Sequence, residues 1–238
     1  MAEWRRPKEP VHPDVCYGKV DRGCPFDCGL CAAHEQLPCS VLLEVTDRCN
    51  LHCAICFADS GGRQTKDPTL QDISRLLERA MRAVGPCNLQ LSGGEPTLRE
   101  DLPEIVEVAT RVGYSFIQVN TNGLRLASDE DYGRRLRAAG LSSVFLQFDG
   151  VDDGINLTLR GRALLGEKLK AIRMCGETGL GVVLVPTLVR GVNTDSVGTI
   201  VRQALQLAPV VRGIHFQPSA TSAAFHKQVT RGDSPSPS

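Results

Sequence analysis

The sequence lacks an excess of charge of either sign and has few aromatic residues. Lys and Arg together number 27, as do Asp and Glu, and aromatic residues make up 5% of the chain. A nucleic-acid-binding surface needs an excess of basic residues, and a polybasic membrane anchor needs the same positive charge. We therefore expect no nucleic acid among the partners and no anionic membrane surface.

Long apolar runs are also missing. No segment approaches the roughly 18 apolar residues that a membrane-spanning helix requires. The amino-terminal stretch MAEWRRPKEP contains no apolar run of the kind that export signals carry. We expect no transmembrane segment and a cytoplasmic location, where cysteines stay reduced.

Cysteine, in contrast, is abundant. The chain has ten cysteines, and all but Cys87 and Cys175 lie between Cys16 and Cys56. Reduced thiols gathered in this way indicate a metal or iron–sulfur site rather than a disulfide scaffold, because a long sequence of ordinary composition follows them. Cys175 shares the apolar spacing of Ile172 and is predicted to lie in the core, whereas Cys87 has no predicted role.

From Val41 onward, segments with the character of strands alternate with segments of helical periodicity. The predicted strands are 41–46, 89–91, 116–119, 143–148, 182–185 and 211–216, and the predicted helices begin after 67–69 and lie within 102–109, 131–139, 165–172 and 197–205. This alternation predicts parallel βαβ units with right-handed crossovers. Six such units fit a doubly wound sheet or a partial barrel, and periodicity alone leaves both open.

Composition divides the chain into three parts. Residues 1–40 form a cysteine-rich segment predicted to bind an auxiliary metal or cluster, and residues 41–218 form the α/β domain. Residues 219–238 are rich in Ser and Thr and end in SPSPS, which is typical of a disordered tail.

The first motif follows the first predicted strand. The segment VTDRCNLHCAICF places Cys49, Cys53 and Cys56 at the spacing C-x3-C-x2-C. Three thiolates on a tight loop can bind three irons of a 4Fe–4S cluster and leave the fourth iron open. Ligands of parallel sheets bind at the carboxyl ends of strands, where this loop lies. A zinc knuckle is the alternative, although zinc usually takes paired C-x2-C elements and four ligands.

The second motif is LSGGEP, which follows the second predicted strand. Gly93 and Gly94 let a ligand approach the backbone, Glu95 offers a carboxylate to an ammonium group, and Pro96 fixes the turn. Alone, this sequence could be an ordinary strand-to-helix turn. Its position one unit after the cysteine motif favours a ligand site.

Together, CNLHCAICF and SGGEP resemble the radical S-adenosylmethionine (SAM) superfamily. The resemblance implies a partial (β/α)6 barrel of TIM-like type. It also implies that one electron, from a donor such as ferredoxin or flavodoxin, cleaves SAM to methionine and a 5′-deoxyadenosyl radical that removes hydrogen from an unactivated carbon. The residues that the resemblance implies are Cys49, Cys53 and Cys56 for the SAM-binding cluster, with Phe57, Gly93, Gly94, Glu95 and Pro96 for SAM itself.

Polar residues at later strand ends are further candidates for binding SAM or substrate. Those after the third, fourth and fifth predicted strands are Asn120, Asn122, Gln147, Asp149, Thr187, Arg190 and Asn193. The alternative for Asn-Gly and Asp-Gly is turn chemistry. Arg160 and Arg162 could reach a phosphate or carboxylate, or could start a solvated helix.

A second copy of the C-x3-C-x2-C spacing lies upstream, in CPFDCGLCAAHEQLPC. No strand precedes it, and a fourth cysteine lies close by, so we expect a closed site here and the open SAM-binding cluster downstream. The closed site would be an auxiliary 4Fe–4S cluster or a structural zinc. Its predicted ligands are Cys24, Cys28, Cys31 and Cys39, and Cys16 could replace one of them.

The upstream segment also resembles one subgroup, which contains archaeal tetraether lipid synthase and pterin-methylating radical SAM enzymes. This resemblance implies a lipid or small-molecule substrate that undergoes carbon–carbon coupling or methylation. Members of that subgroup are longer, so we expect a truncated chain. The alternative function is a non-catalytic iron–sulfur or zinc-binding protein derived from such an enzyme.

Overall fold

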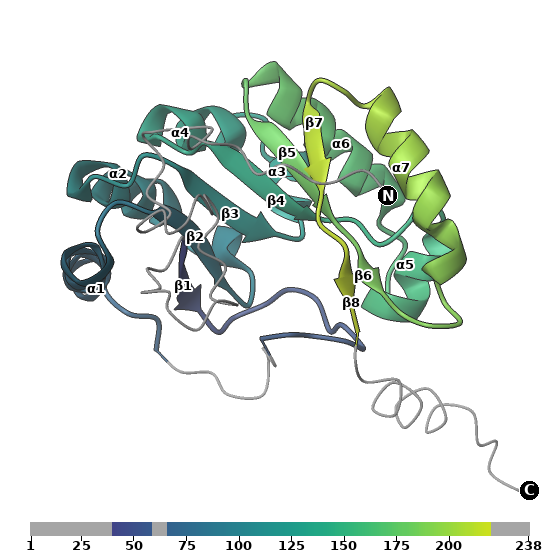
Figure 1. Cartoon of the computed structure of the whole chain (residues 1–238), viewed down its shortest axis with the longest axis horizontal. Helices are drawn as coiled ribbons and strands as arrows, with labels where there is room; N and C mark the ends of the chain where they lie inside the picture. The colour runs from purple at the N-terminus through teal and green to yellow at the C-terminus, as the bar shows by residue number, and fades with distance from the viewer. Residues whose placement is uncertain (1–39, 59–65, 220–238) are drawn as a thin grey trace, which may run out of the picture.

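The computed structural model describes residues 40–58 and 66–219, and their centre is a six-stranded parallel sheet (Figure 1). Its strands are β1 (Ser40–Thr46), β2 (Asn88–Gly93), β3 (Ile117–Thr121), β4 (Ser143–Gln147), β5 (Gly181–Val185) and β7 (Val211–Ile214). They lie side by side in chain order, and every neighbouring pair is parallel. A doubly wound sheet would reverse its order at a switch point, so the order supports the partial barrel.

Five helices confirm those predicted from periodicity. They are α1 (Leu70–Val84), α2 (Leu102–Val112), α4 (Tyr132–Ala139), α6 (Leu165–Glu177) and α7 (Val197–Gln206). The predicted start of α1 is also confirmed, because the Thr69 hydroxyl accepts from the Asp72 backbone N–H and the Asp72 carboxylate accepts from the Thr69 backbone N–H. This reciprocal capping box fixes where the helix begins.

Several short elements were not predicted. They are α3 (Leu124–Ser128), α5 (Asp153–Arg160), the 3-10 turns η1 (Pro96–Leu98) and η2 (Thr194–Ser196), and a two-stranded parallel sheet of β6 (Thr187–Leu188) and β8 (Gln217–Pro218). Most of them are too short to show a period in the sequence. The helix α5 is as long as α4, but two of its three buried residues, Asn156 and Arg160, are polar, so its buried positions show no apolar spacing. The interpretation of Arg160 as a solvated helix start was wrong, because this residue ends α5 and is 4% exposed.

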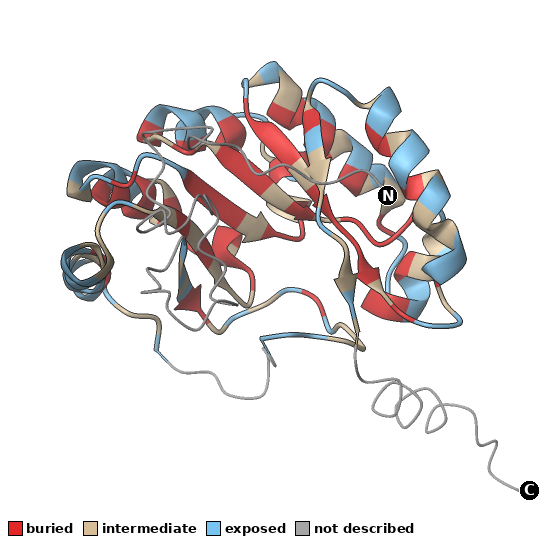
Figure 2. Ribbon diagram, viewed as in Figure 1, coloured by how far each residue is buried: buried red, intermediate tan, exposed pale blue. Residues whose placement is uncertain are grey.

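The two faces of the sheet differ in chemistry. On the face toward the helices, alternate strand residues such as Leu89, Leu91, Val144 and Leu184 are fully buried (Figure 2). Burying each such side chain contributes about 1.5–3 kcal/mol. Cys175 is also buried in this core, as predicted. The opposite face carries the other alternate residues and is mostly polar, which leaves a lined interior at the centre of the partial barrel.

In the part of the chain that the structure describes, none of the helices is both long enough and apolar enough to cross a bilayer. Apart from Ser40 and Ser219, the predicted cysteine-rich segment and the predicted tail lie outside the described residues.

Candidate active site

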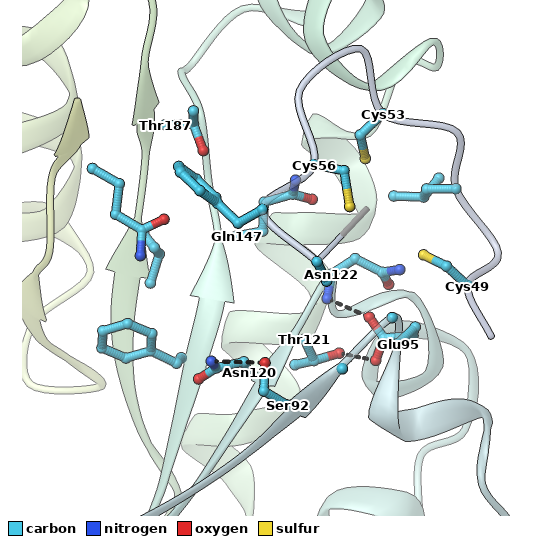
Figure 3. Close-up of a pocket in the computed structure, with 18 of the residues that line it drawn as sticks. Cys49, Cys53, Cys56, Ser92, Glu95, Asn120, Thr121, Asn122, Gln147 and Thr187 are labelled. Atoms are coloured by element: carbon cyan, nitrogen blue, oxygen red, sulfur yellow. Dashed lines mark hydrogen bonds between the residues drawn. The ribbon is translucent and has the colours of Figure 1, made fainter. Parts of the chain in front are cut away.

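A cavity of about 450 Å³ opens inside the partial barrel at the carboxyl ends of the strands. Its walls come from residues on or just after β1 to β6, from the loop that follows β1, from the end of α5, and from His215 and Gln217 after β7 (Figure 3). The predicted site residues among those that line it are Cys49, Cys53, Cys56, Phe57, Gly93, Gly94, Glu95, Asn120, Asn122, Gln147 and Thr187. Most of the residues chosen from sequence motifs therefore share one cavity.

The loop after β1 carries the three cysteines of the downstream motif. Their side chains point toward a common space in Figure 3, and none of them forms a disulfide bond. Among the described residues, no three His, Cys, Asp or Glu side chains come close enough to hold a single metal ion. Three thiols that face one cavity supply the ligand type of a polynuclear iron–sulfur cluster, in which each of three irons takes one thiolate.

Burial raises the pKa of the Cys49 thiol, and the nearby Glu95 carboxylate and the other two cysteines raise it further. The hydrogen bond from the Leu51 backbone N–H acts in the opposite direction. A thiol with a raised pKa stays protonated until a cation binds, so ligation at this position releases a proton.

The glycines of the second motif allow the backbone at the end of β2 to pack closely against the backbone at the end of β1 and the start of the cysteine loop. A Cβ added to Gly93 would lie 2.2 Å from the Thr46 carbonyl oxygen, and one added to Gly94 would lie 2.2 Å from the Arg48 carbonyl oxygen. The N–H groups of Gly94 and Glu95 donate to those same carbonyls, each at 2.7 Å. The glycines therefore seat the end of β2 directly on the start of the cysteine loop.

Glu95 is held rigidly despite its place on the cavity wall. Its side chain is 1% exposed, and Oε1 accepts from the Thr97 backbone N–H and from the hydroxyls of Thr97 and Thr121. Oε2 accepts from the Asn122 backbone N–H at 2.7 Å. Each carboxylate oxygen has about two acceptor directions, so Oε2 keeps one for a ligand. Pro96 begins η1 and does not line the cavity.

Asp149 lies beneath the cavity wall and forms a buried ion pair with Arg160. The guanidinium donates twice to the carboxylate, from Nε to Oδ2 and from Nη2 to Oδ1, each at 2.7 Å. Asp149 Oδ1 also accepts from the Thr187 backbone N–H at 3.0 Å. Burial disfavours the charged guanidinium, but the Asp149 carboxylate outweighs this effect and raises the pKa of Arg160. Asp149 is therefore occupied by protein partners and does not line the cavity.

The same ion pair reaches the cysteine loop. Arg160 Nη1 donates to the Ile55 carbonyl at 2.9 Å, and the Ala54 backbone N–H donates to the Leu159 carbonyl at 3.0 Å. Ala54 and Ile55 lie between the second and third cysteines of the motif, so the end of α5 fixes the conformation of this turn. No sequence motif indicated this link, which joins residues 105 positions apart.

Lys168 of α6 is a further buried charge beside the cavity. It is 1% exposed, and its Nζ donates to the Asn122 carbonyl at 2.5 Å and to Gln147 Oε1 at 3.1 Å. Burial lowers its pKa to about 8, against a partial opposing effect of Asp149. Sequence reasoning missed Lys168, because a lysine in an amphipathic helix usually lies in solvent.

The remaining lining residues come from several elements. They are Leu42, Glu44, Gln90, Ser92, Thr121, Phe145, Val185, His215 and Gln217 on or just after strands, Arg160 at the end of α5, and Leu51, Ile55 and Ala58 of the cysteine loop. Arg162 and Arg190 are exposed and do not line the cavity, and Asn193 is buried beside Asp149. The predicted upstream ligands Cys24, Cys28, Cys31 and Cys39 lie outside the described residues.

Comparison with known proteins identifies relatives of this architecture. Residues 43–204 match the family model described as the radical SAM superfamily. The chain is 44% identical over 223 residues to the 7,8-dihydro-6-hydroxymethylpterin dimethyltransferase of Methanocaldococcus jannaschii, an alignment that covers 92% of this chain and 44% of that protein. It is 26% identical over 200 residues to the GTP 3′,8-cyclase of Rhodopirellula baltica, which covers 82% of this chain and 55% of that protein.

Among solved structures, Streptococcus suis SuiB bound to the precursor peptide SuiA has the same fold. The TM-score is 0.66 at 16% identity, covering 79% of this chain and 41% of that chain. The present chain thus spans about half the length of the curated relatives that it matches.

Proposed function

The chain belongs to the radical SAM superfamily, and from that premise we propose that its cavity binds SAM at a 4Fe–4S cluster held by Cys49, Cys53 and Cys56. One observation carries this proposal: the three thiols and the Gly93–Glu95 turn meet at one cavity, joined by direct backbone hydrogen bonds. The thiols supply the ligands of three irons, and the turn supplies a carboxylate for the amino group of SAM.

The chemistry of the bound group is that of its superfamily. Held by Cys49, Cys53 and Cys56, a 4Fe–4S cluster would supply the single electron for reductive cleavage of bound SAM, and an external donor such as ferredoxin or flavodoxin would have to deliver that electron. The protein residues bind and orient the reactants. Glu95 Oε2 accepts from the ammonium group. Asn122 and Thr187 line the same cavity, and the Thr187 hydroxyl, which accepts from Arg160 Nη2, donates to a polar group of SAM.

The cavity is also large enough to hold SAM, which would displace water from the place where the radical forms. Its volume of about 450 Å³ is in the range of cofactor-sized sites, about 300–1,000 Å³. Placing a substrate C–H close to the radical carbon in such a cavity favours hydrogen abstraction over side reactions. We propose that Phe57, on the rim, packs against the adenine end of SAM.

For the substrate, we propose a small molecule of the pterin class that becomes methylated on carbon. The relative with 44% identity is a pterin dimethyltransferase, and the alignment covers nearly all of this chain. A lipid, which the tetraether-synthase resemblance also allows, is the second candidate. The upstream cysteines remain a prediction of a separate, closed cluster or zinc site.

The proposal is tested by electron paramagnetic resonance (EPR) of the anaerobically reconstituted, dithionite-reduced protein. Adding SAM should change the spectrum of one cluster, because SAM binds its open iron. The variant Cys53→Ser should lose this cluster, with about four fewer irons per chain, while the matched control Cys87→Ser keeps it. A protein with a complete cluster whose EPR spectrum does not change when SAM is added would contradict the proposal.

A further inference from the structure

One wall of the cavity is formed by the inner faces of β1 to β4, on the side away from Cys53 and Cys56 in Figure 3. Glu44 pairs in register with Ser92, and Asn120 pairs in register with Phe145. Asn120 Nδ2 donates to Ser92 Oγ at 3.3 Å, which links the two pairs. Glu44, Ser92, Asn120 and Phe145 therefore form one transverse row, which we call the inner row.

Glu44 contributes an unpaired negative charge to this row. Glu44 is one of the residues that line the cavity, it is exposed on the edge strand β1, and it makes no hydrogen bond or ion pair with any other residue that the structure describes. An ionised carboxylate has about four acceptor directions and no donor. A ligand beside Glu44 must therefore present N–H or O–H groups.

Gln90, one position deeper in the cavity, also presents an acceptor. A chain of hydrogen bonds runs from Gln90 Nε2 to Gln118 Oε1, from Gln118 Nε2 to Ser143 Oγ, and from Ser143 Oγ to the Gly181 carbonyl. The carbonyl at its end can only accept, so the direction of every bond in the chain is fixed. Gln90 therefore uses its amide nitrogen within the wall, and its side-chain carbonyl oxygen is left as the acceptor that Gln90 can offer to the cavity it lines.

Asn120 supplies a third acceptor. Its Nδ2 is used by Ser92, and its Oδ1 is buried without a hydrogen-bond partner within the described part of the chain. A buried acceptor without a donor is unfavourable and rare in folded proteins. A donor from a bound molecule would satisfy it.

Cations are missing from the lining. Within residues 40–58 and 66–219, the only Lys or Arg that lines the cavity is Arg160, and its guanidinium is already bonded to Asp149, Thr187 and the Ile55 carbonyl. A polyphosphate needs several charge-assisted donors, usually Lys, Arg or a metal ion. With Glu44 unpaired as well, this wall repels a polyphosphate.

An aromatic surface completes the inner row. The rings of Phe145 and His215 lie with their centroids 5.3 Å apart, and both line the cavity. Flat ligands gain favourable contact from stacking on such rings. The wall thus combines acceptors along one edge with an aromatic face.

We propose that the inner row binds an uncharged planar heterocycle, whose adjacent ring N–H and exocyclic amino group face Glu44, and that it rejects nucleoside polyphosphates. The proposal rests on the proposed function, since it treats this wall as the substrate side of the SAM cavity. It goes further by assigning Glu44 as the residue that selects among heterocycles.

The test is equilibrium binding to the reconstituted, SAM-loaded protein under anaerobic conditions. The probes are 7,8-dihydro-6-hydroxymethylpterin, its lumazine analogue with oxygen in place of the 2-amino group, and GTP. The pterin should bind at least tenfold more tightly than the lumazine, because the oxygen of the lumazine is an acceptor and would face the Glu44 carboxylate, which is also an acceptor. The pterin should also bind at least tenfold more tightly than GTP.

Glu44→Gln removes the charge but keeps the shape of the side chain. It should weaken pterin binding about 10- to 100-fold and reduce the preference for pterin over lumazine, since the amide can donate. The matched control Glu177→Gln, an exposed change on α6, should change neither value. Equal affinities for pterin and lumazine, tight binding of GTP, or unchanged binding in Glu44→Gln would each overturn the proposal.

Release of 5′-deoxyadenosine by the same samples separates the two proposals. If the nucleoside forms but the probes show none of the expected preferences, the assignment of Glu44 fails and the proposed function stands. If the protein fails to bind or cleave SAM, the proposed function fails, whatever the heterocycles do.

Discussion

The Arg160 guanidinium and the Asp149 carboxylate form a bidentate ion pair, 4% and 0% exposed, beneath the turn that carries the second and third cysteines. The ends of α5 and β4 thereby support the cysteine loop, because Arg160 also donates to the Ile55 carbonyl. The fold thus positions a loop of little regular structure through one buried pair.

Removing one partner of this pair should destabilise the fold. Asp149→Asn leaves the buried guanidinium without its counter-charge, so we expect a loss of about 3–5 kcal/mol in the free energy of unfolding. Urea unfolding of the metal-free protein measures this loss. Arg162→Gln, an exposed change two residues beyond Arg160, should alter it by less than about 0.5 kcal/mol.

The ion pair should also govern retention of the cluster. Arg160→Lys keeps the positive charge but cannot make the bidentate contact together with the bond to Ile55, so we expect faster loss of iron from the reconstituted protein. The time course of iron release to a chelator reports this. If Arg160→Lys retains iron as long as the unaltered protein does, the support assigned to Arg160 is wrong.

Gly93 should tolerate no side chain. Its φ is +126°, and the added Cβ of Gly93→Ala would lie 2.2 Å from the Thr46 carbonyl oxygen, which belongs to the backbone and cannot move alone. We expect a loss of more than about 3 kcal/mol in stability, or loss of cluster assembly, because strain at the φ and an overlap of atoms add together.

Gly166→Ala is the matched control for this prediction. Gly166 lies in the first turn of α6, with no atom within 4 Å of the added Cβ. Alanine there should be neutral or stabilise the protein by up to about 1 kcal/mol. Similar thermal midpoints for the two variants would show that the contact between Gly93 and Thr46 is unimportant.

The buried Lys168 should make stability depend on pH. Its pKa is about 8 in the fold and about 10.4 in an unfolded chain. Between these values the unfolded state binds more protons, so stability rises with pH. We expect the unfolding free energy of the unaltered protein, minus that of Lys168→Met, to increase between pH 8 and 10.5 and to stay level between pH 6 and 7. A level difference over the whole range would contradict the lowered pKa.

Replacing Glu95 with glutamine, which has nearly the same shape, should lower both the stability of the fold and the affinity for SAM. In Glu95→Gln, one of the two carboxylate oxygens becomes an NH2 group that faces a donor, either Asn122 N–H or the groups around Oε1. We expect a loss of about 2–4 kcal/mol in stability and weaker SAM binding by calorimetry. The exposed Glu104→Gln on α2 should leave both unchanged.

The strands, the long helices and the motif residues could be predicted from the sequence, because each has a recognisable pattern within a short stretch of residues. Leu89 and Leu91 show the alternation of a strand, and Asp67, Pro68 and Thr69 mark the start of a helix. The helix α5 shows no apolar period, so the sequence left two alternatives open for Arg160. The solvated helix start was wrong, and the carboxylate that Arg160 reaches is Asp149 of the protein itself.

The inner wall of the site was predicted only in part. Asn120 was a candidate at a strand end and Ser92 lies in the LSGGEP motif, but Glu44 belongs to an ordinary strand sequence and becomes a neighbour of Ser92 only through the register of β1 and β2. Gly93 and Gly94 illustrate a partial success. Their need for close approach was predicted, but the structure shows a backbone rather than a ligand at the point of contact.

The central claim is that Cys49, Cys53 and Cys56 hold the cluster that cleaves SAM. The most direct measurement is the amount of 5′-deoxyadenosine formed from SAM by the reconstituted, dithionite-reduced protein, compared with the variants Cys49→Ala and Cys28→Ala. The account predicts formation by the unaltered protein, none by Cys49→Ala, and continued formation by Cys28→Ala. No 5′-deoxyadenosine from a protein with a full complement of iron and sulfide, or formation that depends on Cys28 and not on Cys49, would contradict it.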